Sequence, residues 1–73
     1  MREYQFSLNI SADDYIYYYR GRVSKVSVLA WDGTRIEFHA ERLRSFVTSS
    51  GIQGQFILST DDQHRFISLV KVK

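Results

Sequence analysis

Apolar and polar residues alternate over the first ten positions of the chain. The apolar positions are Tyr4, Phe6, Leu8 and Ile10. Successive side chains of a strand point to opposite faces, so this spacing collects the four apolar side chains on one face. The segment is therefore predicted to be a strand with one buried face.

A helix is predicted directly after this strand, over residues 12–20. Ser11 is a favourable N-cap, and Asp13 and Asp14 would lie in the first turn, where the helix dipole favours negative charge. Gly21 would end the helix in a left-handed conformation that other residues adopt at a cost. The helix is thus bounded by a start signal and a stop signal.

Four of the nine predicted helical residues are tyrosines. Helical spacing places Tyr15, Ile16 and Tyr19 on one stripe, which we expect to pack against the sheet. Tyr17 would then point away from this stripe, and the rings of Tyr17 and Tyr18 would lie over neighbouring surface with their hydroxyls in water. A short helix buries only one stripe of its surface, so this segment is expected to expose aromatic side chains.

Residues 23–30 and 34–38 are predicted to form a hairpin around Trp31, Asp32 and Gly33. A two-residue loop would place Val28 opposite Glu37. A three-residue loop with Gly33 as a G1 bulge instead pairs Val26 with Phe38 and Val28 with Ile36. Because a one-residue slip moves every side chain to the other face, the burial pattern favours the bulged turn. The outward face would carry Lys25, Ser27, Leu29, Arg35, Glu37 and His39.

A second, shorter helix is predicted over residues 40–47. Its apolar side chains, Leu43, Phe46 and Val47, would point inward. Arg42 and Arg44 would point outward.

Two further strands are predicted in the C-terminal third of the chain. Alternation defines the fourth strand from Ile52 to Leu58, and the fifth covers residues 65–72. In the fifth strand, regular alternation would place Phe66 and Ile67 on opposite faces. Either both faces are partly covered, or a bulge near Ser68 changes the register.

The predicted order of elements is β-α-β-β-(short α)-β-β, which indicates a small α+β domain. All 73 residues would form one domain. The strands are expected to form a mainly antiparallel, twisted sheet or partial barrel with one covering helix.

Composition narrows the classes of protein to which the chain could belong. It lacks cysteine, so disulfides and thiolate metal sites are excluded, and its formal net charge is +2. No apolar stretch approaches the roughly 20 residues that span a bilayer. The N-terminus lacks the apolar run of a signal peptide. We therefore expect a cytoplasmic protein without membrane contact.

Catalytic signatures are missing. His39 and His64 are the two histidines, and the predicted strands do not combine them with a nucleophile and an acid. Asp61, Asp62 and His64 could contribute to a weak cation site, but aspartates that bond their own backbone are common in turns. We expect no enzyme, no cofactor and no metal site.

The aromatic and basic residues around the predicted helix end suggest a binding surface. Tyrosine, tryptophan and arginine are enriched at interface hot spots. The candidate partner-binding residues are Tyr17, Tyr18, Arg20, Arg22 and Trp31. The sequence thus favours a small binding or adaptor module that contacts an unknown protein partner or forms a homodimer.

An alternative is the binding of single-stranded nucleic acid, RNA in particular. Arginines and lysines neutralise phosphates, and exposed aromatic rings stack on unpaired bases. The candidate residues are Tyr17, Arg20, Arg22, Lys25, Arg42 and Arg44. The low net charge disfavours this alternative.

Several short motifs resemble those of a known family. They are FSLNIS at 6–11, YRG at 19–21, VSV at 26–28 leading to DG at 32–33, LRSFVT at 43–48, GIQGQF at 51–56 and FISL at 66–69. In this combination the chain is similar, over nearly its whole length, to an uncharacterised family of short bacterial proteins, domain of unknown function 2835. The resemblance implies a bacterial, cytoplasmic protein and brings no established activity, cofactor or site residues. The predicted helix is richer in tyrosine than the family pattern.

Overall fold

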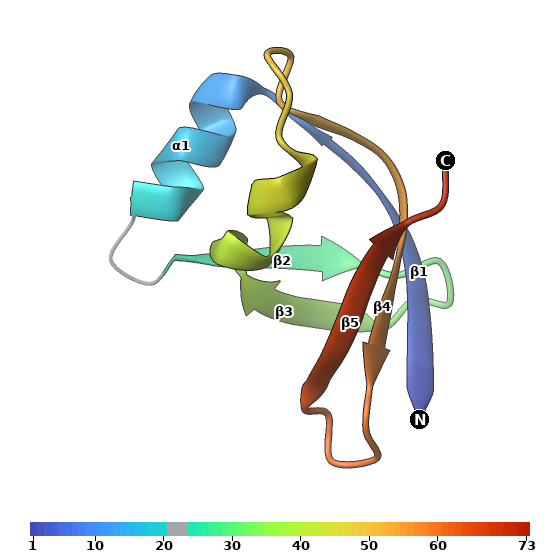
Figure 1. Cartoon of the computed structure of the whole chain (residues 1–73). Helices are drawn as coiled ribbons and strands as arrows, with labels where there is room; N and C mark the ends of the chain where they lie inside the picture. The colour runs from blue at the N-terminus through green and yellow to red at the C-terminus, as the bar shows by residue number, and fades with distance from the viewer. Residues whose placement is uncertain (21–23) are drawn as a thin grey trace.

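The computed structural model describes residues 1–20 and 24–73. These residues form five strands, an α-helix and a 3₁₀ helix, in the predicted order (Figure 1). The elements are β1 (Arg2–Ile10), α1 (Ala12–Arg20), β2 (Lys25–Leu29), β3 (Arg35–His39), η1 (Ala40–Phe46), β4 (Ile52–Thr60) and β5 (Phe66–Lys71). The predicted stop at Gly21 and the start of the hairpin at Val23 lie outside the described residues.

β1, β4 and β5 form an antiparallel sheet with β4 in the centre and β5 at one edge (Figure 1). In the β1–β4 register Phe6 lies opposite Phe56, and Tyr4 lies opposite Leu58. Of the four apolar positions predicted for the first strand, three therefore lie opposite apolar residues of β4, and Leu8 lies opposite Gly54. Phe6 and Phe56 are stacked with ring centroids 6.0 Å apart.

β2 and β3 form the second sheet, and their register confirms the bulged hairpin. Val26 pairs with Phe38 and Val28 pairs with Ile36. Gly33 has a φ of +91°, as the G1 position requires. All six residues predicted for the outward face are exposed.

The sequence is compatible with two registers for β5, and the structure contains the one with a bulge. Thr60 pairs with Phe66 while Ser59 pairs with Ser68, so Ile67 is the extra residue. The shift returns Phe66 and Leu69 to the same side of the strand, and both pack against the core. Ile67 is left exposed.

η1 is a 3₁₀ helix of seven residues, and its period of three selects the buried side chains. Ala40, Leu43 and Phe46 share one face. Leu43 is fully buried and Phe46 packs with its ring 5.2 Å from that of Phe56. The prediction that Val47 points inward was wrong, because Val47 lies beyond the last turn, in extended backbone, and is exposed.

The two sheets enclose one core and do not close into a barrel. Phe6 of the first sheet lies 5.8 Å, centroid to centroid, from Phe38 of the second. At the hairpin tip, the backbone N–H of Trp31 donates a hydrogen bond of 2.8 Å to the carbonyl oxygen of Gln5 in β1. The α+β prediction is therefore confirmed, with two antiparallel sheets in place of one continuous sheet.

α1 covers one open end of this core (Figure 1). Its packing depends on Gly51, which has a φ of +99° and lies against the junction between β1 and α1. A Cβ atom there would be 2.7 Å from the nitrogen of Ala12. In the part of the chain that is described, neither helix is long and apolar enough to cross a bilayer.

Candidate protein-contact site

α1 begins as predicted, with a side-chain cap. The backbone N–H of Asp14 donates a hydrogen bond of 3.1 Å to the Ser11 hydroxyl oxygen, which satisfies one of the free donors of the first turn. Asp13 and Asp14 lie in that turn and Arg20 lies in the last. Both charges therefore complement the helix dipole, and they give α1 a negative end and a positive end.

Tyr15 attaches α1 to the rest of the protein. It is the buried residue of α1, and its hydroxyl donates a hydrogen bond of 3.1 Å to the carbonyl oxygen of Ala40. Burial raises the pKa of the Tyr15 phenol above its usual value, and the neighbouring Tyr19 adds to the effect. The single buried anchor fixes which side of α1 faces solvent.

The side of α1 opposite Tyr15 carries four exposed residues that we call the outer stripe. They are Asp13, Ile16, Tyr17 and Arg20. At 3.6 residues per turn, their spacing keeps them within about 100° of one another around the helix. Tyr17 is 78% exposed and Ile16 is 47% exposed. The outer stripe is thus acidic at one end, apolar in the middle and basic at the other end.

The prediction that Ile16 and Tyr19 are buried was wrong. Ile16 belongs to the outer stripe, and Tyr19 is 40% exposed with its ring 5.8 Å from that of Tyr15. Ala40 and Leu43 of η1 fill the core next to α1, so the helix contributes one side chain and not a whole stripe. Tyr17 is exposed as predicted, and Tyr18 lies edge-on to it at 6.3 Å.

Trp31 is exposed but does not join the tyrosines. Ser24, before β2, donates a hydrogen bond of 3.2 Å to the carbonyl oxygen of Tyr19, whereas Trp31 follows the other end of that strand. The five residues of β2, which span about 17 Å at ~3.3 Å per residue, lie between these points. Of the predicted partner-binding residues, Tyr17 and Arg20 share the outer stripe, and Tyr18 contacts Tyr17 from outside it. Trp31 lies apart, and Arg22 is outside the described residues.

The basic residues proposed for nucleic-acid binding are divided over different surfaces. Residues two apart in a 3₁₀ helix point in directions about 120° apart, so Arg42 and Arg44 diverge. Arg42 lies over the ring of Phe66 in β5, with its Cζ 4.0 Å from the ring centroid. Arg44 lies on the side of Tyr15, where its charge opposes the rise in the pKa of that phenol. Lys25 begins β2, close to the end of α1.

Sequence reasoning missed a groove between η1 and β5. It measures about 560 Å³ and is lined by residues that include Arg42, Phe46, Phe66 and Leu69. Two sequence signals pointed towards it. The first is the spacing of three between Ala40, Leu43 and Phe46, which is the period of a 3₁₀ helix. The second is the bulge considered near Ser68, because it brings Phe66 and Leu69 to one side of the strand.

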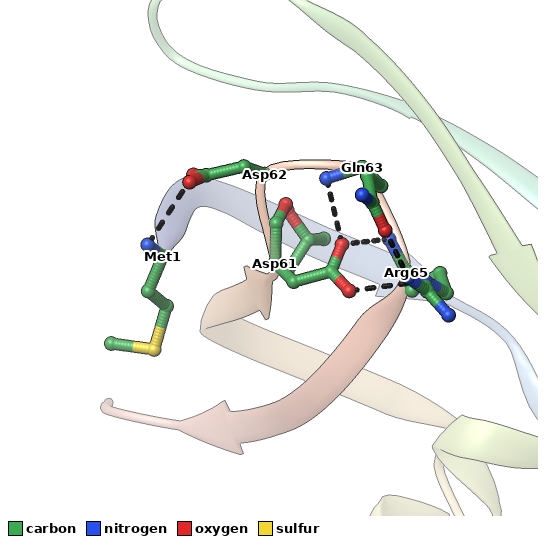
Figure 2. Close-up of polar contacts among 6 residues, drawn as sticks. Met1, Asp61, Asp62, Gln63 and Arg65 are labelled. Carbon is green, nitrogen blue, oxygen red and sulfur yellow. Dashed lines mark hydrogen bonds and ion pairs between the residues drawn. The ribbon is translucent and has the colours of Figure 1, made fainter.

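The Asp61–Arg65 segment is a turn stabilised by its own polar groups (Figure 2). The backbone N–H groups of Gln63 and Arg65 donate hydrogen bonds of 2.8 and 2.9 Å to Oδ1 of Asp61. Nε of Arg65 lies 3.1 Å from Oδ2 of the same carboxylate. Asp61 thus acts as a turn residue, and the described residues contain no group of three or more His, Cys, Asp or Glu side chains that could hold a metal ion.

Comparisons with known proteins identify a family and nothing closer. No curated protein and no solved structure matches the chain. The family model described as "Protein of unknown function (DUF2835)" matches residues 2–72. Since this match covers almost all of the 73 residues, the chain belongs to the DUF2835 family.

Proposed function

We propose that this protein is a non-enzymatic contact module that associates with a second copy of itself through the outer stripe of α1. The observation that carries the proposal is the order of residues along this exposed stripe. Asp13 lies at one end, Ile16 and Tyr17 lie in the middle, and Arg20 lies at the other end.

This order is complementary to itself. When two copies of α1 pack antiparallel about a two-fold axis, Asp13 of each copy faces Arg20 of the other. Ile16 and Tyr17 then meet at the axis, where apolar contact supplies most of the free energy. The two helix dipoles also oppose each other, which is the favourable arrangement.

The contact is expected to be weak. A helix of nine residues is about 14 Å long, and its surface is well below the ~800 Å² per partner of a standard interface. We therefore expect a dissociation constant on the order of 10⁻⁴ M, in the range of transient contacts.

Charge reversal tests the antiparallel arrangement. Asp13→Arg gives a stripe that is basic at both ends, and Arg20→Asp gives one that is acidic at both ends. Sedimentation velocity between ~10 μM and ~1 mM should show self-association of the unchanged protein and its loss in either variant. An equimolar mixture of the two variants should associate again, because each basic end then meets an acidic end.

A matched control is Arg44→Asp, which makes the same charge change on a different element and should leave self-association unaltered. The proposal is overturned if the unchanged protein remains monomeric at ~1 mM. It is also overturned if the mixed variants associate no better than either variant alone.

Binding of single-stranded RNA is the second candidate, because exposed Tyr17 and Arg20 lie one turn apart on the outer stripe. It receives less support, since Arg42 and Arg44 lie on other surfaces. Fluorescence anisotropy with a 20-nucleotide oligo(U) at 20 and 150 mM salt tests it. Phosphate contacts would give affinity that falls steeply with salt, and absence of binding at 20 mM would eliminate this candidate.

A further inference from the structure

The groove between η1 and β5 adjoins an open edge of the three-stranded sheet. β5 pairs with β4 along one edge and ends the strand order. The lining of the groove comes from His39, from η1 and from β5, and none of it comes from β4. The groove therefore lies over β5 and not over β4, next to the edge where the backbone N–H and C=O groups of β5 face outward for a further strand.

Arg42 is held over this groove with its donors available. Its guanidinium stacks on the ring of Phe66, with Cζ 4.0 Å from the centroid. Within residues 1–20 and 24–73, this side chain makes no hydrogen bond and no ion pair. A guanidinium stacked on a ring still has its planar set of N–H groups available to bind a carboxylate. Because stacking already restricts the arginine side chain, less conformational entropy is lost when the carboxylate binds.

The charges around the edge favour an acidic partner. Residues 63–73 contain Arg65, Lys71 and Lys73 and no acidic residue. Arg65 is paired with Asp61, which leaves the two lysines and Arg42 as cations without an ion-pair partner among the described residues. Glu41 is the one acidic residue in the groove lining.

A second copy of β5 does not fit this edge as well. Antiparallel pairing of two β5 strands would bring Lys71 of each copy to the start of the other strand, next to Arg65, and like charges opposite each other are destabilising. The strand offers no carboxylate to compensate. The occupant that fits is a different chain carrying acidic side chains in extended conformation.

We propose that an extended acidic segment of a partner protein binds here by strand addition. Its backbone pairs with the free edge of β5, and one of its carboxylates accepts a bidentate pair of hydrogen bonds from Arg42. An apolar side chain of the segment lies in the groove against Phe46, Phe66 and Leu69. This site is separate from the outer stripe of α1, so it would act whether or not the protein self-associates.

Three synthetic hexapeptides of alternating sequence provide the probe, each acetylated, amidated and fluorescein-labelled. The first alternates Glu and Val, the second Gln and Val, and the third repeats the first with every backbone amide N-methylated. Fluorescence anisotropy at 20 mM salt should give a dissociation constant below ~1 mM for the Glu peptide. The dissociation constants of the other two peptides should be at least fivefold higher. Amide NMR shifts on adding the Glu peptide should concentrate in β5 and η1.

Arg42→Gln should weaken binding of the Glu peptide by about tenfold, the loss expected for a charge-assisted bond. Arg44→Gln makes the same change on the other side of η1 and should alter binding less than twofold. Three outcomes would overturn the proposal of an acidic segment. The Glu peptide does not bind at ~1 mM, the Gln peptide binds equally well, or the two variants lose the same affinity for the Glu peptide. Undiminished binding of the N-methylated peptide would overturn strand addition.

Discussion

The hydroxyl of Tyr15 donates a buried hydrogen bond of 3.1 Å to the carbonyl oxygen of Ala40. The bond joins α1 to the first residue of η1, across 25 positions of sequence. It forms where the helix covers the core, and it satisfies both a buried phenol and a buried backbone acceptor. The orientation of α1, and with it the outer stripe, depends on this contact.

Tyr15→Phe is expected to lower the free energy of unfolding at pH 8 by about 1 kcal/mol, because the buried oxygen of Ala40 loses its donor. The measurement is urea denaturation followed by circular dichroism. Tyr17→Phe removes a hydroxyl on the exposed side of the same helix and should change the free energy by less than about 0.5 kcal/mol. A cost for Tyr17→Phe equal to that for Tyr15→Phe would contradict the assigned helix orientation.

Stability should also fall at alkaline pH through Tyr15. The pKa of this phenol is raised in the folded protein above its ordinary value of 10.0, so the unfolded chain loses the proton first. Its stabilising contribution is complete below pH 10 and is lost as the pH rises through the folded pKa. Urea denaturation at pH 9 and pH 11 should show a smaller decrease in Tyr15→Phe than in the unchanged protein.

Asp32 should make a contribution to stability that is lost at acidic pH, in contrast to that of Tyr15, which is lost at alkaline pH. Its carboxylate accepts a hydrogen bond of 2.9 Å from the backbone N–H of Thr34, and this bond lowers the pKa of Asp32 below its ordinary value of 3.8. The contribution is present above pH 3.8 and is lost as the pH falls through the lower, folded pKa. The difference in stability between Asp32→Ala and the unchanged protein should therefore shrink between pH 5 and pH 2.5, as measured by urea denaturation.

Gly51 and Gly33 provide a matched pair of substitutions. Both have positive φ, but a Cβ at Gly33 would meet nothing within 4 Å, whereas one at Gly51 would lie 2.6 Å from the carbonyl carbon of Ser11. Gly33→Ala should cost about 1–2 kcal/mol, from backbone conformation alone. Gly51→Ala should cost clearly more, because the junction of β1 and α1 must move. Equal costs in thermal unfolding would rule out the close approach at Gly51.

The stability costs of Leu43→Ala and Tyr19→Ala should differ, because one side chain near α1 is in the core and the other is at the surface. Leu43 is fully buried, and its truncation should cost about 2–5 kcal/mol, enough to unfold much of so small a domain. Tyr19 is 40% exposed and its ring lies 5.8 Å from that of Tyr15, so Tyr19→Ala should cost about 1 kcal/mol. Denaturation of both variants checks the order. A larger loss for Tyr19→Ala would mean that α1 buries more of its surface than Tyr15 alone.

Local signals in the sequence were sufficient for most of the fold. Ser11 marked the start of α1, and the requirement that Val28 meet an apolar partner selected the hairpin register with Gly33 in the bulge. These features depend on residues close together in sequence. The bulge at Ile67 was one of two registers that the sequence allowed. The choice between them depends on which side of β5 faces the core, and this is not determined by neighbouring residues in the sequence.

The candidate site was less predictable, since it depends on what packs beside each element. Spacing alone could not show that η1 fills the core next to α1, and this is why Ile16 was wrongly expected to be buried. The contact of Arg42 with Phe66 joins residues 24 positions apart, from elements whose relative placement no local pattern records. Tyr17 was correctly predicted to be exposed because it lies opposite Tyr15 on any helix.

The hydrogen bond from Trp31 to Gln5 has a consequence for assembly. It places the hairpin tip against the outer edge of β1, so the three-stranded sheet is obstructed at that end of its strand order and open at β5. A strand that added along β1 would have to displace the hairpin tip at Gln5, whereas the outer edge of β5 pairs with no other described strand. Repeated edge-to-edge growth into an open-ended fibril would therefore require this hydrogen bond to break.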